Sequence, residues 1–394
     1  MNKSLAAIIF LVMPGVNAMA QGEGSHRSES GVVITPELQS GYQYDDNLYN
    51  RSADEQGSSV FVFAPSGNFL LEDGVNRYAL DVGISSGHYL GQSDDDYLDG
   101  DIVFSGHFEP DSLQRLNLQV GANWRSEARG TGITEARHDL IDSPLRYFEQ
   151  QAGLSYEYGA LSSKAQLAFE LGYLDKSYNN YQDITKYYDY SALLTGAKVF
   201  FTTHHRSQLF VELNRNTIRY EHLDNSGKSR DSDDYNLLTG FRWQATAVTA
   251  GRVILGYQLK DFTDQQRDNF NGLSWDVSLD WQPLTYTKVS IETQRKAKEP
   301  NVEGDYILAS LYGLSWSHHW NDVLTTSVSG SYGEEDYQGV SRTDETRTLA
   351  LSLDYRMSRW ADVSLFGQMS DKDSSRRDIQ FDKHLVGLNF VFSL

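Results

Sequence analysis

The clearest pattern in the sequence is Val386-Gly387-Leu388-Asn389-Phe390-Val391-Phe392-Ser393-Leu394. Side chains of a β-strand alternate between its two faces, so every second residue from Val386 to Leu394 lies on one strongly apolar face. The other face is smaller and more polar. Strands of outer-membrane barrels often end this way, and the sequence therefore predicts that Phe390, Phe392 and Leu394 act as an assembly signal. A soluble β-sandwich could also end in an amphipathic strand.

The first residues carry the pattern of an export signal. Lys3 precedes an apolar run from Leu5 to Met13, and an A-x-A cleavage site follows at residues 18–20. We expect residues 1–20 to be a signal peptide, residues 21–30 a short periplasmic segment, and residues 31–394 a single outer-membrane β-barrel. The apolar run is too short for a membrane-spanning helix, and no later stretch reaches 18 consecutive apolar residues.

The composition further narrows the class of protein to which this chain can belong. The 394 residues would suit two soluble domains or one large barrel, and the formal net charge of −20 argues against a nucleic-acid partner. There is no cysteine, so no disulfide framework is expected. Only 7 prolines accompany 24 tyrosines, a balance that suits long hydrogen-bonded strands.

From Gly31 onward, strand-like segments of about ten residues are joined by connections that are alternately short and long. An even number of strands, with short turns at one end and long loops at the other, is the plan of a bacterial outer-membrane barrel. The eight predicted short turns are 72–75, 109–111, 158–160, 202–204, 246–248, 282–284, 319–321 and 359–361. The nine predicted long loops are 44–58, 89–100, 126–145, 176–186, 221–234, 261–271, 296–304, 333–346 and 370–384, which makes 17 connections and 18 strands.

The strands themselves favour a transmembrane antiparallel β-barrel, an all-β fold, over a soluble sandwich or a propeller. Apolar and polar residues alternate through segments such as 273–281 and 349–357, and tryptophans such as Trp124 and Trp281 stand at strand ends like an interfacial girdle. Ten residues, tilted by about 40°, span roughly 25 Å, the height of an outer-membrane apolar band. A sandwich of 18 strands would need several domains with linkers, and no blade repeat of a propeller is visible.

The same alternation places a mixed set of charges on the predicted lumen face. They can be interpreted as a polar conduit that grips a hydrated solute such as a sugar polymer, or as cross-strand salt bridges that only stabilise a polar interior. The predicted lumen-lining residues are Arg77, Asp81, Asp101, Arg115, Arg125, Glu149, Glu170, Arg242, Arg252, Asp276, Asp280, Lys288, Glu292, Asp354 and Arg356. The position of Arg215 and Arg219 stays open, either above the membrane or beyond a bulge.

The candidate motifs for a catalytic or metal site lack the required spacing or structural context. The acidic runs 94–96, 231–234 and 333–336 lack the spacing of a calcium loop, and we expect them to be solvated loop surfaces met by cations that bridge lipopolysaccharide. Gly83-Ile84-Ser85-Ser86-Gly87 fits G-x-S-x-G but lies in a strand pattern with no helix after it. We therefore expect no enzyme activity, no cofactor and no metal, although distant strands could still bring suitable groups together.

The stretch from Gly41 to Tyr49 reads G-x-x-Y-D-D-N-x-Y and resembles the start of the "putative β-barrel porin" family, which includes outer-membrane barrels encoded with exopolysaccharide and capsule synthesis systems. The resemblance implies that Asp45, Asp46 and Asn47 open the first extracellular loop. It also implies a conduit that exports an exopolysaccharide or capsular polysaccharide together with inner-membrane polymerisation and periplasmic export proteins.

Three hypotheses follow for a protein of the bacterial cell outer membrane. The first is polysaccharide export, the alternative is a diffusion porin for small solutes or oligosaccharides, and the third is a structural surface protein. Its expected partners are outer-membrane lipid and lipopolysaccharide, the polysaccharide substrate and the barrel assembly machinery, with no nucleic acid. We also expect the longest loop, 126–145, to fold inward and constrict the pore.

Overall fold

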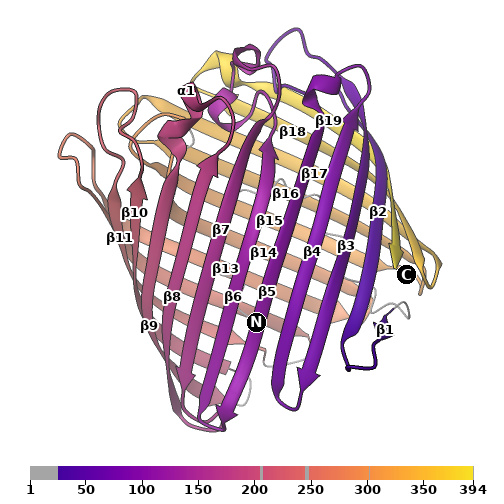
Figure 1. The fold of residues 1–394 in the computed structure, drawn as a ribbon, viewed down its shortest axis with the longest axis vertical. Helices are drawn as coiled ribbons and strands as arrows, with labels where there is room; N and C mark the ends of the chain where they lie inside the picture. Colours follow the sequence, from indigo (N-terminus) through magenta and orange to yellow (C-terminus); the bar gives the residue numbers. More distant parts are fainter. Residues whose placement is uncertain (1–24, 205–206, 245–247, 301, 394) are drawn as a thin grey trace.

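Eighteen antiparallel strands, β2 to β19, close into a barrel in the computed structural model, which describes residues 25–204, 207–244, 248–300 and 302–393 (Figure 1). Each strand pairs with the next one along the chain, and β19 pairs with β2 to complete the ring. A closed ring leaves no unpaired sheet edge, as a membrane interior requires. The predicted fold class is confirmed, and the predicted signal peptide lies outside the described residues.

Strands β2 to β19 are long and nearly uniform, whereas β1 has only two residues. Their bounds are β1 His26–Arg27, β2 Val33–Asp45, β3 Ser58–Asp73, β4 Asn76–Tyr89, β5 Tyr97–Asp111, β6 Gln114–Glu127, β7 Leu145–Tyr158, β8 Ala165–Tyr178, β9 Tyr190–His204, β10 Ser207–Tyr220, β11 Ser232–Trp243, β12 Thr249–Phe262, β13 Phe270–Leu284, β14 Thr287–Lys298, β15 Ile307–His319, β16 Leu324–Tyr337, β17 Arg342–Ser358, β18 Ala361–Ser374 and β19 Phe381–Ser393. The connections hold a short helix, α1, Gln182–Thr185, and five 3₁₀ turns at 93–95, 132–134, 138–140, 186–188 and 377–379. Among the described residues, no helix is long and apolar enough to cross a bilayer.

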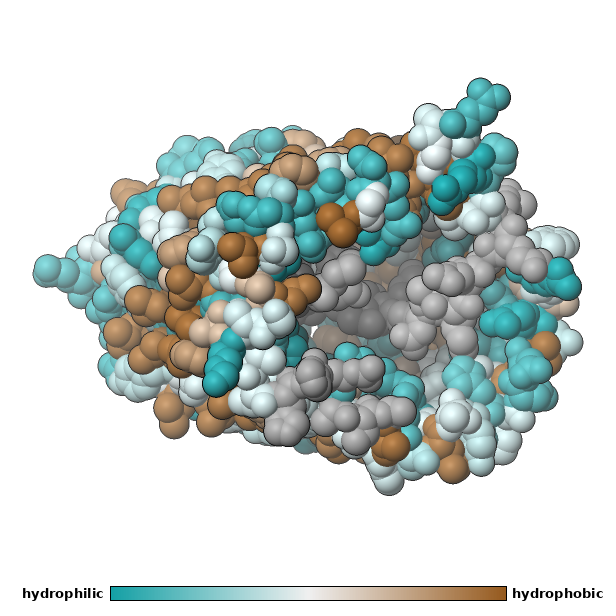
Figure 2. Space-filling model, turned by 90° about the horizontal axis from the view of Figure 1, so that it is seen from below, coloured by the Kyte–Doolittle hydropathy of each residue, from teal (hydrophilic) through white to brown (hydrophobic). Residues whose placement is uncertain are grey.

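The two faces of each strand differ as the alternation predicts. On β17, Leu349, Leu351 and Leu353 are each about half exposed on the outer face, whereas Ala350 and Ser352 between them are buried. Seen from the end with the short turns, the molecule is hollowed in its middle, and apolar patches lie around its outer side (Figure 2). The outer face is therefore the lipid-facing one, and the other face lines the lumen.

The last strand closes the barrel against the first long one. Residues 385–393 pair with residues 45–37, with Leu388 opposite Tyr42 on the outer face. The rings of Phe390 and Phe392 stack on this face, 6.3 Å apart, and Phe392 also stacks on Trp360. These two predicted assembly-signal residues thus face the lipid side, whereas Leu394 lies outside the described residues. Their recognition by an assembly machinery remains a prediction.

The two ends of the barrel differ in the way the sequence predicts. Short turns gather at the lower end in Figure 1 and the long loops, with α1, at the upper end. Two short turns fall slightly later than predicted, at 112–113 and 285–286, because the strands continue through Pro110 and Pro283. By the usual topology of such barrels, the short turns face the periplasm and the loops face the outside.

Two predicted long loops, 333–346 and 370–384, are largely strand. Only residues 375–380 of the second connect β18 to β19. Residues 333–346 are not a loop: β16 continues to Tyr337 and β17 starts at Arg342, which leaves a connection of only residues 338–341. The acidic residues in this stretch suggested a loop. They are tolerated because here the strands extend beyond the membrane, where Glu335 pairs with Lys298 on the inner face.

Arg215 and Arg219 also lie near the upper end of the barrel. Both lie on the outer face of β10, two and six residues beyond the exposed Leu213, and both pair with Asp233 of β11 at 3.2 Å. β10 keeps a regular register with β11 through this region. The strand therefore carries these arginines above the apolar band, and no bulge is involved.

Candidate functional site

All the charged residues predicted to line the lumen lie on the inner face, because the exposed apolar residues of their strands occupy the alternate positions. What this wall of charges does in transport remains a prediction.

The structure joins several of these wall charges into pairs across neighbouring strands. Most pairs are partly exposed; the side chains of Arg252 and Asp276, for example, are 36% and 28% exposed. Asp354 instead accepts hydrogen bonds from Ser352 and Ser364, and Asp81 accepts one from Asn68. The ion pairs are Arg125–Asp101 at 3.2 Å, Arg252–Asp276 at 2.8 Å, Lys288–Asp280 at 3.2 Å, Arg115–Glu157 at 3.0 Å and Arg356–Asp362 at 3.7 Å.

Other charged residues of the lumen wall do not form such ion pairs within the described part of the chain. Arg242 stands directly opposite Arg252, a like-charged pair that Asp276 offsets from one side only. Glu149 is buried, and its Oε2 has no hydrogen-bond partner in the described structure. The wall is thus an uneven ladder of charges.

The longest loop, residues 128–144 between β6 and β7, folds over the lumen. Its Glu135 accepts a hydrogen bond from Arg342 of β17 at 2.7 Å and is paired with Lys372 of β18. Both partners lie on inner faces, and β17 stands nearly half-way round the barrel from β7. This contact across the lumen is the inward fold that the length of the loop predicted.

A second connection, between β14 and β15, folds inward from another part of the wall. Glu299 binds the Lys260 ammonium of β12 and accepts a hydrogen bond from the Tyr220 hydroxyl at 3.0 Å. Gln258 of β12 also holds the backbone of Ala297, donating to its carbonyl at 3.1 Å and accepting from its N–H at 3.0 Å. β14 therefore bends inward before the connection begins.

The two inward loops meet at Arg342, whose side chain is 1% exposed. Its guanidinium binds Asp344 on its own strand, Glu135 of the β6–β7 loop, and Glu303 of the β14–β15 connection at 3.1 Å. We name this group the mouth cluster; its members are Glu135, Glu303, Arg342, Asp344, Lys372 and Arg376.

Sequence reasoning missed the mouth cluster for a definable reason. Arg342 and Lys372 fell inside stretches read as loops, so no inward face was assigned to them. The available signal was alternation: Arg342 and Asp344 share the parity of Ala350 and Ser352 on the inner face of β17. The partners Glu135 and Glu303 had no such signal, because they lie in connections of irregular backbone.

The G-x-x-Y-D-D-N-x-Y stretch forms a clasp between the first and last strands of the barrel. Asn47 is fully buried, and its Nδ2 donates to the carbonyl of Asp382 in β19 at 2.9 Å. Asp45 pairs with Lys383 at 2.7 Å. Asp46 accepts from the backbone N–H of His384 at 2.7 Å. The three polar residues therefore open the first long loop and fix it to β19.

Tyr49, at the end of this stretch, ties three loops together. Its hydroxyl donates to Asp95 of the β4–β5 loop at 2.7 Å and accepts from Arg129 of the β6–β7 loop at 2.6 Å. Burial, followed by the hydrogen bond to Asp95, raises the pKa of Tyr49 to about 12, so the phenol keeps its proton at neutral pH. The base of the inward β6–β7 loop is thus fixed to its neighbours.

Acidic residues of the runs 94–96 and 231–234 serve as acceptors in the loops and at the strand ends next to them. Asp95 binds Arg129, Asp96 binds His88, and Asp231 and Asp234 bind the Tyr220 N–H and Lys260. No group of three or more possible metal ligands occurs among the described residues. The G-x-S-x-G stretch lies within β4, without the turn and helix that a nucleophile elbow needs.

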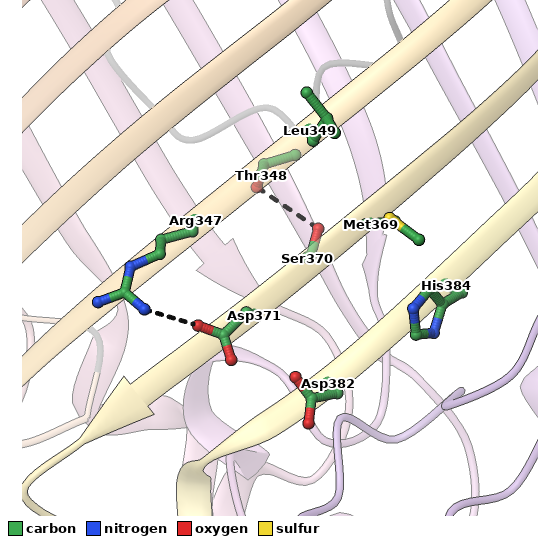
Figure 3. A pocket seen from close by; sticks show the side chains of 8 residues that line it. All are labelled: Arg347, Thr348, Leu349, Met369, Ser370, Asp371, Asp382 and His384. Carbon is green, nitrogen blue, oxygen red and sulfur yellow. Dashed lines mark hydrogen bonds and ion pairs between the residues drawn. The ribbon is translucent and has the colours of Figure 1, made fainter.

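A shallow hollow does occur on the outside of the barrel, across the upper ends of β17, β18 and β19. Arg347 points toward Asp371 there, with Asp382 beside them (Figure 3). Leu349 and Met369, which share the hollow, are half-exposed on the lipid-facing side. This hollow therefore does not belong to the route through the lumen.

Solved structures share the overall shape of this barrel. OccK2 (OpdF) of Pseudomonas aeruginosa aligns with a TM-score of 0.53 at 11% identity over 93% of this chain and 98% of its own. OccK11 (OpdR) of the same organism aligns with a TM-score of 0.51 at 13% identity over 93% of this chain and 97% of its own. At these identities the likeness shows the fold alone. No curated protein matches the chain in sequence.

The family comparison extends over the whole barrel. The family model described as "Putative beta-barrel porin 2" matches residues 31–394, which include every strand from β2 to β19. With the closed ring, the lipid-facing outer side and the charged lumen already described, this match places the protein in the bacterial outer membrane as a porin-type barrel. The chain belongs to the "Putative beta-barrel porin 2" family.

Proposed function

We propose that the protein is a diffusion porin that lets small hydrophilic solutes cross the outer membrane through a narrowed extracellular mouth. The observation that carries this proposal is the meeting of two inward loops at Arg342. Loops that cross a lumen limit the size of what passes, while a wall of partly exposed ion pairs below them offers exchangeable contacts to a hydrated solute.

This proposal departs from the export of a polysaccharide, which stays a prediction. A polymer chain in transit would have to displace Glu135 and Glu303 from Arg342 for as long as export lasts, and the buried guanidinium would lose two of its three carboxylate partners. A small solute needs only a brief local opening. The OccK2 barrel, solved in a complex with glucuronate, is an example of this fold with a ligand of monosaccharide size.

The test is reconstitution of the full chain. We expect discrete single-channel conductance in planar bilayers, and proteoliposomes that swell in monosaccharides but not in long oligosaccharides. Loss of the size limit in an Arg342→Met variant would tie it to the mouth cluster.

Two results would contradict the proposal. One is an absence of conductance above that of protein-free bilayers. The other is a clean deletion strain that loses its surface polysaccharide while its uptake of small solutes is unchanged, which would favour export.

A further inference from the structure

We infer that Arg230 is the centre of a binding site for a small hydroxylated carboxylate of the sugar-acid class, at the extracellular end of the lumen. The inference rests on the proposed porin function and adds a substrate class to it. Arg230 lies in the β10–β11 loop, one residue after Ser229 and two before β11 begins at Ser232, and it is only 6% exposed.

The first argument is the missing partner of this arginine. Its Nε and Nη1 are buried and have no hydrogen-bond partner in the described structure. A guanidinium withdrawn from water without an acceptor is strongly unfavourable, and buried charges in proteins are normally paired. An anion that binds there would satisfy both nitrogens.

The other buried cations of the described residues make the contrast clear. Each of them has a carboxylate partner supplied by the chain itself. The pairs are Arg115 with Glu157, Lys198 with Glu212, Lys260 with Asp234 and Glu299, Arg267 with Asp224 and Asp305, and Arg342 with Asp344, Glu135 and Glu303. Arg230 is as deeply buried as these residues, yet its loop brings it against aromatic rings instead.

Those rings fix the orientation of the guanidinium. Its central carbon lies 4.7 Å from the ring centre of Tyr188 and 5.8 Å from that of Tyr220. Tyr220 in turn packs against Tyr190, with 5.4 Å between their ring centres. A guanidinium that rests on ring faces can donate hydrogen bonds only within its own plane, so it presents a preorganised edge to a planar oxyanion.

The surroundings define the rest of the ligand. The hydroxyls of Tyr188 and Tyr220 each donate one hydrogen bond, to the Val302 carbonyl and to Glu299, and can still accept one from a sugar hydroxyl. The ring edges of this aromatic group suit the C–H groups of a pyranose. Glu299, which accepts a hydrogen bond from Tyr220 beside Arg230, is also bound by Lys260 and forms no ion pair with Arg230. A neutral sugar would leave the charge of Arg230 unpaired as well, whereas a sugar acid offers both features.

The site is also linked to the mouth of the barrel. The Tyr188 hydroxyl donates to the carbonyl of Val302 at 3.2 Å, and the Tyr220 hydroxyl holds Glu299. The rings that orient Arg230 therefore also hold the β14–β15 connection, which bears Glu303 of the mouth cluster. A ligand that reaches Arg230 must shift this connection, so binding and opening of the mouth are coupled.

The experiment is thermal unfolding of the purified full-length barrel with galacturonate, galactose, acetate or inorganic phosphate. We expect galacturonate to raise the Tm of the wild type and galactose to leave it unchanged. Arg230→Gln should weaken galacturonate binding at least tenfold, and Arg230→Lys should restore part of it, because a charge remains without the planar donors. Arg377→Gln, which removes the same charge from an exposed site in the β18–β19 loop, should bind like the wild type.

Several outcomes would overturn the inference. An equal effect of acetate or phosphate would make this a general anion site, and an equal effect of galactose would remove the role of the charge. Unchanged galacturonate binding in Arg230→Gln would exclude this residue. If that variant does not fold, block of the wild-type channel by extracellular galacturonate but not galactose decides the question. A barrel without conductance that is still stabilised by galacturonate would refute the porin proposal and keep this site.

Discussion

Ion pairs occur both on the lumen wall and in the mouth cluster of this barrel, but they differ in burial and in what they hold together. On the wall, Arg252 and Asp276 pair across two neighbouring strands with about a third of each side chain exposed. At the mouth, Arg342 is 1% exposed and joins β17 to two loops, one from nearly half-way round the ring and one from two strands away. The wall charges stay hydrated and exchangeable, whereas the mouth charges fix the positions of segments far apart in the sequence.

Burial explains the difference. An exposed pair contributes about 0–1 kcal/mol, because water and salt screen it. A buried pair can be close to neutral in net stability, but removal of one partner costs about 3–5 kcal/mol, since the other charge remains without compensation. The mouth should therefore be sensitive to single substitutions that the wall tolerates.

The largest effect is expected from Arg342→Met. It leaves the carboxylates of Glu135, Glu303 and Asp344 without their common partner and should destabilise the closed mouth by about 3–5 kcal/mol. Single-channel conductance should rise, and backbone amides of residues 128–144 should exchange hydrogen faster. The matched change on the wall, Arg252→Met, should leave both measurements close to wild type. Equal effects of the two variants would contradict the distinction between wall and mouth.

The next largest effect is expected from Gln258→Met, which is close to glutamine in size but lacks its polar groups. The buried backbone of Ala297 loses two hydrogen bonds, and about 1–3 kcal/mol is the usual cost of one unsatisfied group. Because β14 then bends inward less firmly, amides of residues 296–300 should lose protection. Ser274→Ala, on the inner face of the neighbouring β13, serves as the control.

The sequence predicts the wall far better than the mouth. Alternation is a local property, so a single strand such as 273–281 already shows which residues face the lumen, and counting connections then gives the closed ring. Glu135 and Arg342 are 207 residues apart in the sequence, and their contact follows only from the closure of the barrel and the path of an irregular loop. No local pattern carries that information.

The motif at Gly41–Tyr49 also makes long-range contacts that the sequence does not show. Its residues indicated the family, but its structural role appears only in three dimensions. There Asn47 donates a hydrogen bond to a carbonyl of β19 that lies 335 residues away in the sequence. Arg230 is similar: as one loop arginine among many it carried no signal. Its lack of a carboxylate partner depends on Tyr188 and Tyr220, which come from separate connections and strands.

A smaller effect is expected from Lys288→Met on the wall. The side chains of Lys288 and Asp280 are 45% and 47% exposed, so loss of their pair should cost less than about 1 kcal/mol. The unpaired Asp280 carboxylate should instead shift the lumen toward cations. Reversal potentials in a salt gradient should show this change while Tm stays within a degree or two of wild type. A large drop in Tm would mean that the wall pairs are structural after all.

The smallest effect concerns His138 in the β6–β7 loop, which stacks on the ring of Tyr49 with 4.6 Å between ring centres. Burial and the nearby positive charge of Arg51 lower the pKa of His138 from its ordinary value of 6.5. Because the docked loop prefers the neutral imidazole, its docking is strongest above pH 6.5 and weakens as the pH falls through the lowered pKa. Open-channel noise should therefore increase below pH 6.5 in the wild type. In His138→Gln, which stays neutral, the noise should be the same above and below pH 6.5, and a persistent acid response would assign it to another group.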